Sequence, residues 1–207
     1  MNITRYKCAG IIFLKLIMGV LFLCLFPSVV YAQMQSKGPA IALKTNALYW
    51  ATTTPNLGFE VALGKKLTLD VSGGYNPFTF GDNKKMKHWL IQPELRWWTC
   101  ETYNGHFLGA HIHGGTYNVG GVDLPLGAFP SLKDYRYEGE FYGGGLSYGY
   151  QWILNRRWSL EGEIGVGYAR INYDKYGCPK CGEFLGSDSH DFFGVTKAAI
   201  SIIYIIK

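Results

Sequence analysis

From about residue 40 to residue 207, bulky apolar residues alternate with small or charged residues in one segment after another. Near residue 160, Trp158, Leu160, Ile164 and Val166 share one parity, while Glu161 and its neighbours of the other parity are charged or small. Successive side chains of a strand point to opposite faces, so each segment has one bulky apolar face and one small, charged face. This two-residue period predicts a chain built of β-strands.

Glycines on the charged parity indicate which face lies inside. In a soluble barrel the bulky apolar face fills the interior and the charged face meets water. Glycines mixed with charges suit a narrow, crowded interior better than a solvated exterior, and a bulky apolar exterior suits lipid. We therefore expect an all-β fold, an eight-stranded antiparallel up-and-down transmembrane β-barrel in the bacterial outer membrane.

Eight segments carry the alternation, and connections of alternating length join them. The predicted strands cover residues 40–50, 56–64, 66–76, 88–99, 106–118, 138–152, 157–173 and 191–206. Three connections are short (64–65, 99–105 and 153–156), one is intermediate (51–55), and three are long (77–87, 119–137 and 174–190). Short turns on one side and long loops on the other are typical of outer-membrane barrels. The even number of strands places both termini on the short-turn, periplasmic side.

The first 32 residues have the features of a cleavable secretory signal peptide. Arg5 and Lys7 form a basic start, an apolar stretch runs from 11 to 26, and residues 30–32 (Val-Tyr-Ala) offer a small-residue cleavage site. The alternative is a retained membrane helix, but Lys15 leaves an uninterrupted run about half as long as a spanning helix needs. We expect a signal peptide over 1–32, a short segment over 33–39 and the barrel over 40–207.

Composition and charge argue against nucleic-acid-binding proteins and helical membrane proteins. Without the signal peptide about 175 residues remain, enough for one domain, with 17 basic and 15 acidic residues. This small excess of basic over acidic residues argues against binding of nucleic acid, which usually requires a concentrated basic patch. No apolar run after the signal peptide is long enough to cross a membrane as a helix. Only a closed barrel, which pairs every backbone group, then remains as a spanning structure.

The tryptophans give an independent indication of a membrane interface. All six lie near the ends of predicted strands, where an aromatic girdle is expected. The predicted girdle consists of Trp50, Trp89, Trp97, Trp98, Trp152 and Trp158. In a soluble sandwich, core tryptophans would instead occupy the middle of strands.

The small or polar parity of the strands predicts a charged interior. The predicted lumen network consists of Lys44, Glu60, Asp70, Glu94, Arg96, His111, His113, Glu161, Glu163 and Lys197. Side chains fill the interior of an eight-stranded barrel, so no wide channel is expected. Charges in such an interior must pair, because an unpaired buried ion is costly. The simplest interpretation is a structural network of salt bridges, and the alternative is a gated path for protons or ions.

His111 and His113 flank one residue and therefore point to the same side of their strand. With Ser147 and a carboxylate such as Glu161 also inward, they suggest a His–Ser–carboxylate hydrolase, as in barrel enzymes that trim lipid A. The pair also offers two metal ligands, but the sequence does not position a third. Packed interior histidines are the default interpretation, and we assign no catalytic residue, no metal and no cofactor.

Cys178 and Cys181 lie in the last long connection, with only Pro179 and Lys180 between them. Two cysteines at this spacing in an oxidising compartment usually close a small disulfide ring. The alternative is half of a zinc site, which Asp188 or His190 would have to complete. We expect a disulfide that stiffens the loop.

Four motifs carry a resemblance to a known family: Ala-Leu-Lys-Thr-Asn at 42–46, Gly-His-Phe-Leu-Gly-Ala-His at 105–111, Tyr-Asn-Val-Gly-Gly at 117–121, and the cysteine loop at 178–181. With these motifs the chain resembles an uncharacterised Bacteroidetes family of small outer-membrane β-barrels, a domain of unknown function. Some members resemble accessory genes beside fimbrial anchors, which implies a context of surface adhesion. The architecture is also distantly similar to the OmpA transmembrane domain, without its periplasmic domain.

These observations favour a non-enzymatic outer-membrane barrel that presents surface loops, in an accessory role to fimbriae or adhesion. Loops on a rigid scaffold commonly carry function. The alternatives are a barrel enzyme that modifies lipid A and a narrow pore. The expected partners are outer-membrane lipid, the barrel assembly machinery and a surface protein or glycan, and nucleic acid is not among them.

Overall fold

The computed structural model describes residues 41–80, 84–121, 135–177 and 182–206. Its elements are β1 (Ile41–Asn46), α2 (Ala47–Ala51), β2 (Asn56–Ala62), β3 (Leu67–Asn76), β4 (Thr79–Phe80), β5 (Lys84–Trp98), β6 (Gly105–Gly120), β7 (Arg136–Ile153), β8 (Trp158–Tyr176) and β9 (Phe184–Ile206). The predicted signal peptide, residues 1–32, and the segment 33–39 lie outside the described residues.

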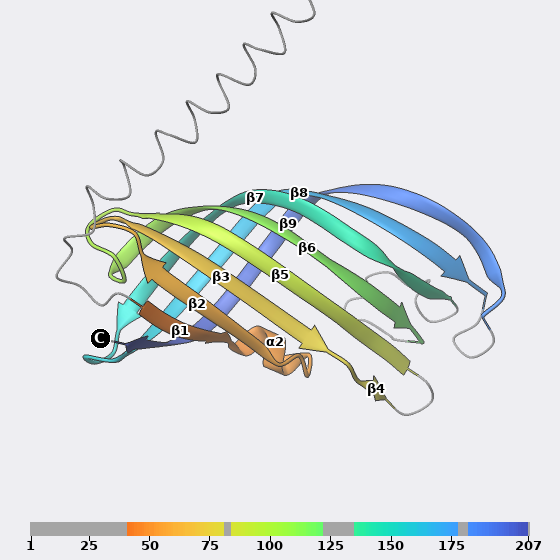
Figure 1. The fold of residues 1–207 in the computed structure, drawn as a ribbon, viewed down its shortest axis with the longest axis horizontal. Coiled ribbons are helices and arrows are strands. Elements are labelled where there is room, and N and C mark those ends of the chain that lie inside the picture. Colours follow the sequence, from red (N-terminus) through yellow and green to blue (C-terminus); the bar gives the residue numbers. More distant parts are fainter. Residues whose placement is uncertain (1–40, 81–83, 122–134, 178–181, 207) are drawn as a thin grey trace, which may run out of the picture.

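The strands form one antiparallel sheet that closes on itself (Figure 1). Each strand pairs with the next one along the chain, except that β3 pairs directly with β5 and the two-residue β4 pairs only with β5. β1 pairs with β9, from Ile41 opposite Ile206 to Asn46 opposite Ser201. Eight strands therefore make a closed ring, which confirms the predicted all-β, eight-stranded, antiparallel up-and-down arrangement.

The strands differ greatly in length, and this gives the ring a tall side and a low side. β1 has 6 residues, whereas β8 has 19 and β9 has 23. β7, β8 and β9 arch far beyond the ends of β1 and β2 toward the long connections (Figure 1). The expected loops 119–137 and 174–190 are correspondingly shorter, because β7 begins at Arg136 and β9 begins at Phe184.

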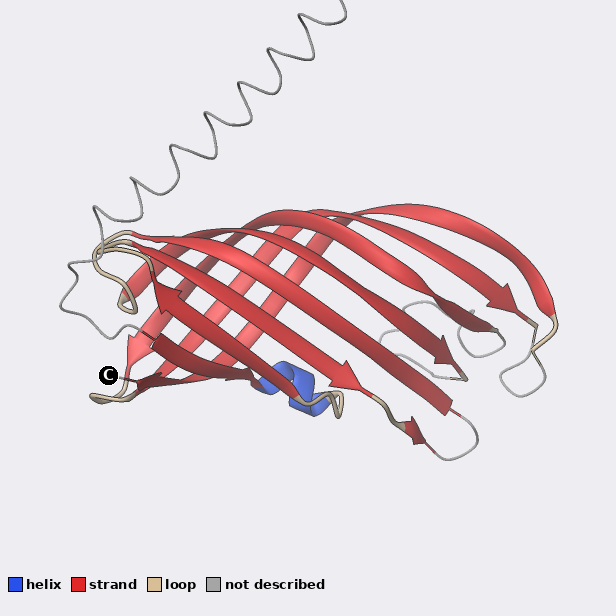
Figure 2. Cartoon of the chain, in the orientation of Figure 1, coloured by secondary structure: helices blue, strands red, loops and turns tan. Residues whose placement is uncertain are grey.

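The first predicted strand, 40–50, ends earlier than expected. β1 stops at Asn46, and Ala47–Ala51 form the helix α2 at the edge of the ring (Figure 2). The Asn46 side chain accepts a hydrogen bond from the amide of Leu48, which satisfies a free N–H of the first turn as an N-cap does. Trp50 therefore lies in a helix rather than at a strand end. Within the described residues, no helix has the length and apolarity needed to cross a membrane.

The inside of the ring is closed by apolar side chains at the end where the short connections lie. Tyr103, Phe107, Ile203 and Ile205 are buried there together with Trp98. The Trp98 ring packs 4.8 Å from Phe107 and 6.1 Å from Tyr103, centroid to centroid. Burial raises the pKa of the Tyr103 hydroxyl, which donates to the carbonyl oxygen of Glu60 at 3.1 Å. We call these five residues the apolar plug.

The position of Trp98 corrects the expected girdle. Its side chain is fully buried and its indole N–H donates to Thr68 Oγ1 at 3.0 Å. The neighbouring Trp97 is 48% exposed, and the other four predicted girdle tryptophans are also exposed. The reason is the alternation of the strand, because Trp98 shares the inward parity of Arg96 and Glu94.

Replacement of Trp98 tests this assignment. Trp98→Ala should lower the free energy of unfolding by about 3–5 kcal/mol, because it leaves a cavity inside the ring. Trp97→Ala removes an exposed indole from the same strand and should lower the free energy of unfolding clearly less. Thermal unfolding of the two purified variants, followed by near-ultraviolet circular dichroism, makes the comparison. Equal losses would show that Trp98 does not belong to the apolar plug.

Candidate functional site

Above the apolar plug, charged side chains from six strands meet inside the ring. They occupy inward positions of neighbouring strands. For example, Glu60 of β2 is paired with Asp70 of β3, which is paired in turn with Glu94 of β5. We call the following residues the charge cluster: Lys44, Glu60, Asp70, Glu94, Arg96, Glu161, Glu163 and Lys197. All eight are buried, with exposed fractions of 0–8%.

Arg96 lies at the centre of the charge cluster. Its Nη1 is 2.9 Å from Glu60 Oε2 and 3.0 Å from Glu161 Oε2. Its Nη2 is 2.7 Å from Glu163 Oε2, and its Nε donates to Glu94 Oε1 at 3.2 Å. A guanidinium carries five N–H donors in a planar fork and is always charged, so one side chain can hold carboxylates on several sides. Arg96 thus links strands that are far apart in the sequence.

Two lysines complete the charge cluster from β1 and β9. Lys44 Nζ lies 2.6 Å from Glu60 and 3.4 Å from Glu161. Lys197 Nζ lies 3.1 Å from Glu163 and also contacts Glu94. Because β1 and β9 are the strands that close the ring, these ion pairs tie the closure to β2 and β8, and the Lys197–Glu94 pair ties it to β5 on the opposite wall.

The charges of the cluster do not balance. Five carboxylates face three cations. Neither oxygen of Asp70 makes a hydrogen bond within the described part of the chain, although Lys44 Nζ lies 3.5 Å away. Beside Asp70 and Glu163 is a cavity of about 30 Å³, which has room for about one water molecule. Asp70 is held by ion pairs alone, since Arg96 Nη2 also lies 3.5 Å from its Oδ2.

Glycines make room for the long charged side chains. A Cβ at Gly109 would lie 1.9 Å from Glu94 Oε1, and a Cβ at Gly58 would lie 2.5 Å from Lys44 Cγ. Neither contact is compatible with an unmoved neighbour, so the absence of a side chain at these positions is a packing requirement. The glycines on the charged parity of the sequence therefore have a structural reason.

The two histidines lie farther along the interior, with ring centroids 5.7 Å apart. His111 Nε2 is 2.9 Å from Thr196 Oγ1, and the His113 ring packs 6.1 Å from Phe141. Ser147 donates to Glu94 Oε1 at 2.7 Å rather than meeting a histidine. Among the described residues the structure does not bring His111, Ser147 and a carboxylate into one hydrogen-bonded chain, and it groups no three side chains suited to hold a metal ion.

Thr196 is a partner that sequence reasoning missed. The register of β8 and β9 shifts between Gly165 and Val166, so Gly165 pairs with Lys197 and Val166 pairs with Val195. This irregularity leaves Thr196 as the extra residue of β9, as in a β-bulge, and directs its hydroxyl toward His111. A strict two-residue period carries no signal for such a position.

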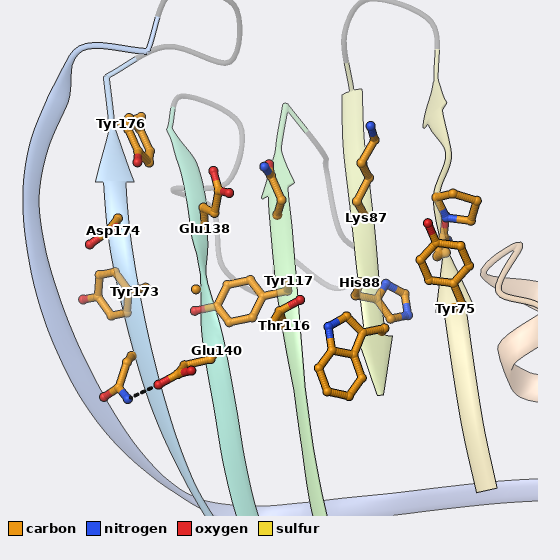
Figure 3. A pocket seen from close by; sticks show the side chains of 16 residues that line it. Tyr75, Lys87, His88, Thr116, Tyr117, Glu138, Glu140, Tyr173, Asp174 and Tyr176 are labelled. Carbon is orange, nitrogen blue, oxygen red and sulfur yellow. Dashed lines mark hydrogen bonds between the residues drawn. The ribbon is translucent and has the colours of Figure 1, made fainter. Parts of the chain in front are cut away.

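A larger cavity lies at the end of the ring that carries the long connections (Figure 3). Its volume is about 750 Å³, and β3, β5, β6, β7 and β8 line it. One row of residues that are paired directly across the five strands crosses the cavity: Asn76, His88, Tyr117, Gly139 and Tyr173. Sequence reasoning did not predict this cavity, although several of its aromatic residues lie near strand ends.

Comparison with known families gives one match. The family model described as "Protein of unknown function (DUF3575)" matches residues 19–206. The chain belongs to this family. No curated protein and no solved structure matches it. The expected membership in a family of unknown function is thereby confirmed for this DUF3575 chain, while its Bacteroidetes origin and its similarity to the OmpA transmembrane domain stay predictions.

This DUF3575 chain has five cysteines, of which Cys8 and Cys24 fall in the predicted signal peptide. Cys178 and Cys181, the predicted disulfide pair, lie outside the described residues. Cys100 lies in the connection between β5 and β6, where its thiol is free and exposed. It therefore offers a natural label on the side of the short connections.

Replacement of Arg96 tests the role of the charge cluster. Arg96→Ala should lower the free energy of unfolding by about 3–5 kcal/mol, because it leaves buried carboxylates without their partner. The matched control is Arg170→Ala, since Arg170 is 40% exposed and pairs with Asp191 on the surface at 3.0 Å. An exposed ion pair contributes little to stability, so this variant should lower the free energy of unfolding clearly less. Thermal unfolding of both variants gives the comparison, and similar losses would contradict a central role for Arg96.

Proposed function

We propose that this DUF3575 chain is a non-enzymatic transmembrane β-barrel of the bacterial outer membrane that presents its long connections at the cell surface. The observation that carries the proposal is the inverted polarity of the ring. Leu108, Ile112, Leu146 and Ile164 are 51–68% exposed, while the charge cluster is buried. Water-soluble monomers rarely expose apolar patches beyond a few hundred Å², so a surface of this kind indicates a lipid environment.

The extent of the apolar surface fits a bilayer. On β8 the outward side chains are apolar from Trp158 to Tyr168, and the next outward residue, Arg170, forms a surface ion pair. These ten residue steps correspond to about 33 Å along the strand. A strand tilt of about 45° reduces this to roughly 23 Å across the membrane, close to the apolar band of about 25 Å in outer-membrane barrels.

The interior supports a scaffold better than a pore. The apolar plug fills the end with the short connections, and the charge cluster fills the section above it. The cavity within the cluster has a volume of about 30 Å³. An aqueous channel needs a continuous wet path, whereas the side chains of the charge cluster are at most 8% exposed and pair with one another.

The interior also supports a scaffold better than a lipid-modifying enzyme. A hydrolase of the kind considered for His111 and His113 needs a base that activates a nucleophile at hydrogen-bonding distance. His111 instead contacts Thr196, and Ser147 contacts Glu94.

In a scaffold of this kind, the surface that binds a partner consists of the long connections and the extended ends of β6 to β9, because loops on a rigid scaffold usually carry function. A role beside fimbriae or other adhesins fits this position.

The proposed orientation has both termini in the periplasm. The signal peptide directs export, the barrel assembly machinery inserts the strands, and outer-membrane lipid surrounds the exterior. Ile41 pairs with Ile206 at the end that carries the short connections, so both described ends of the chain lie on one side. Cys100 lies on that same side.

Thiol labelling of intact cells tests this topology. In a Cys178→Ser, Cys181→Ser background, a maleimide polymer too large to cross the outer membrane should leave Cys100 unmodified until the cells are permeabilised. With Asp188→Cys added, the same polymer should label intact cells, because Asp188 is exposed near the start of β9. A gel shift of the membrane fraction reports both results.

Two controls accompany the labelling. Cys100→Ser in the same background should abolish the shift after permeabilisation, and a periplasmic cysteine protein should stay unlabelled in intact cells. Labelling of Cys100 in intact cells would refute the orientation. Recovery of the protein in the soluble fraction would refute the membrane location.

A further inference from the structure

The part of β9 that arches beyond β1 has a strand partner on only one side (Figure 1). β8 pairs with β9 along almost its whole length, whereas β1 pairs only with residues 201–206. Where β1 ends, the Asn46 side chain takes its place, because its Nδ2 donates to the carbonyl oxygen of Ala198 at 3.0 Å and its Oδ1 accepts from the amide of Ile200 at 3.2 Å. Beyond Ala198, toward the long connections, no strand of the described residues pairs with this side of β9.

This unpaired side is regular over residues 186–195, and we call it the free edge. The pairing of β9 with β8 shifts register at both ends of this range. Between the two shifts it is continuous, from Lys175 opposite Gly186 to Val166 opposite Val195. A strand of this length spans about 33 Å. The free edge is therefore long enough to pair with a whole additional strand.

The backbone of the free edge is accessible. Residues 187–191 are all exposed, although their side chains alternate between the two faces of the strand. The Ser189 N–H donates to a carboxylate oxygen of Asp188 at 2.7 Å, which indicates that this amide points toward the free edge and not toward β8. On β8 the apolar exterior ends at Tyr168, which is paired with Phe193. In the proposed orientation, the residues beyond Phe193 lie outside the lipid.

The free edge lacks the residues that usually keep an exposed edge from pairing. Natural proteins block such edges with lysine, with proline or with a bulge. Residues 186–195 read Gly-Ser-Asp-Ser-His-Asp-Phe-Phe-Gly-Val and contain neither lysine nor proline. The two register shifts lie at the ends of this range and not within it. The free edge is thus open to a further strand.

We propose that the free edge binds an extended, positively charged segment of a separate surface protein, which adds one strand to the sheet beside β9. In this mode of recognition, main-chain hydrogen bonds supply affinity and alternate side chains supply specificity. The proposal rests on the proposed function and names the kind of partner, because the free edge faces outside the cell only in that orientation.

The charge of the partner follows from the carboxylates at the free edge. Asp191 is paired with Arg170 at 3.0 Å, but Asp188 has no ion pair within the described part of the chain. Asp174 lies on β8 beside Ser187, whose hydroxyl donates to it. Opposite charges on adjacent strands attract, so the added strand should carry lysine or arginine near Asp188.

A second copy of this chain does not fit the free edge. Copies in one membrane are inserted in the same direction, so a twofold axis along the membrane normal relates their β9 strands. With a strand tilt of about 45°, the two strands would cross at about 90°. Neighbouring strands in a sheet differ in direction by only about 20–25°. A segment of a separate protein has no such constraint.

Selection of peptides tests whether the free edge accepts a strand. The purified mature protein, folded in lipid nanodiscs, is used to select from a displayed library of random peptides of about ten residues. Enriched peptides should carry lysine or arginine and should slow the hydrogen exchange of amides in residues 186–195. The reason is that main-chain pairing protects these amides, whereas contact with side chains alone does not.

Substitutions at Ser189 connect binding to the backbone. Ser189→Pro removes an N–H of the free edge and should weaken binding of the enriched peptides by about tenfold or more, a change of about 1.4 kcal/mol. The matched control Ser189→Ala keeps the N–H and should change binding less than about twofold. Asp188→Asn should weaken binding and reduce its dependence on salt. Heat-dependent migration on gels verifies that every variant is folded.

Three outcomes overturn the inference. They are the enrichment of no peptide, enriched peptides that bind Ser189→Pro as well as Ser189→Ala, and cross-linking of two copies through Ser189→Cys in an otherwise cysteine-free background, which would assign the free edge to a second copy. These outcomes leave the proposed function intact if Cys100 stays protected in intact cells. Peptides that bind the protein in nanodiscs but not on intact cells would instead refute the proposed orientation, and with it a partner at the cell surface.

Discussion

Arg96 pairs with carboxylates from four other positions and so holds the middle of the ring together. Buried ions are tolerated only when they are paired and hydrogen-bonded, and Arg96 contacts Glu60, Glu94, Glu161 and Glu163 within 3.2 Å. Lys44 and Lys197 extend the same network to the strands that close the ring. The middle of the interior is therefore polar, and the bulky apolar parity of the strands around it lies on the outside.

That inversion connects the charge cluster to the proposed function. Gly58 and Gly109 give the cluster its space, and the apolar plug around Trp98 and Tyr103 closes one end. Since the middle and one end are filled, the open space lies at the other end, where the strands are longest. The cavity there is bounded by rigid strands, which is the arrangement that positions a binding surface well.

The sequence predicted the features that follow from alternation. Strand order, the ring and the inward direction of Glu94 and Arg96 all depend on a period of two. Trp98 shares that parity and is buried, so alternation decides its direction although it lies near a strand end. Thr196 could not be predicted, because a bulge breaks the period locally. The cavity depends on unequal lengths of five strands, which only their pairing determines.

If the ring spans a bilayer as proposed, lipid contacts its exterior and the interior is shielded from lipid. Two single-tryptophan proteins, which keep only Trp97 or only Trp98 and carry phenylalanine elsewhere, are reconstituted into bilayers with brominated acyl chains. The fluorescence of Trp97 should be strongly quenched by the brominated lipid, while that of Trp98 should be protected from the lipid and from aqueous acrylamide. Quenching of Trp97 by acrylamide alone, or equal quenching of both by lipid, would contradict the account.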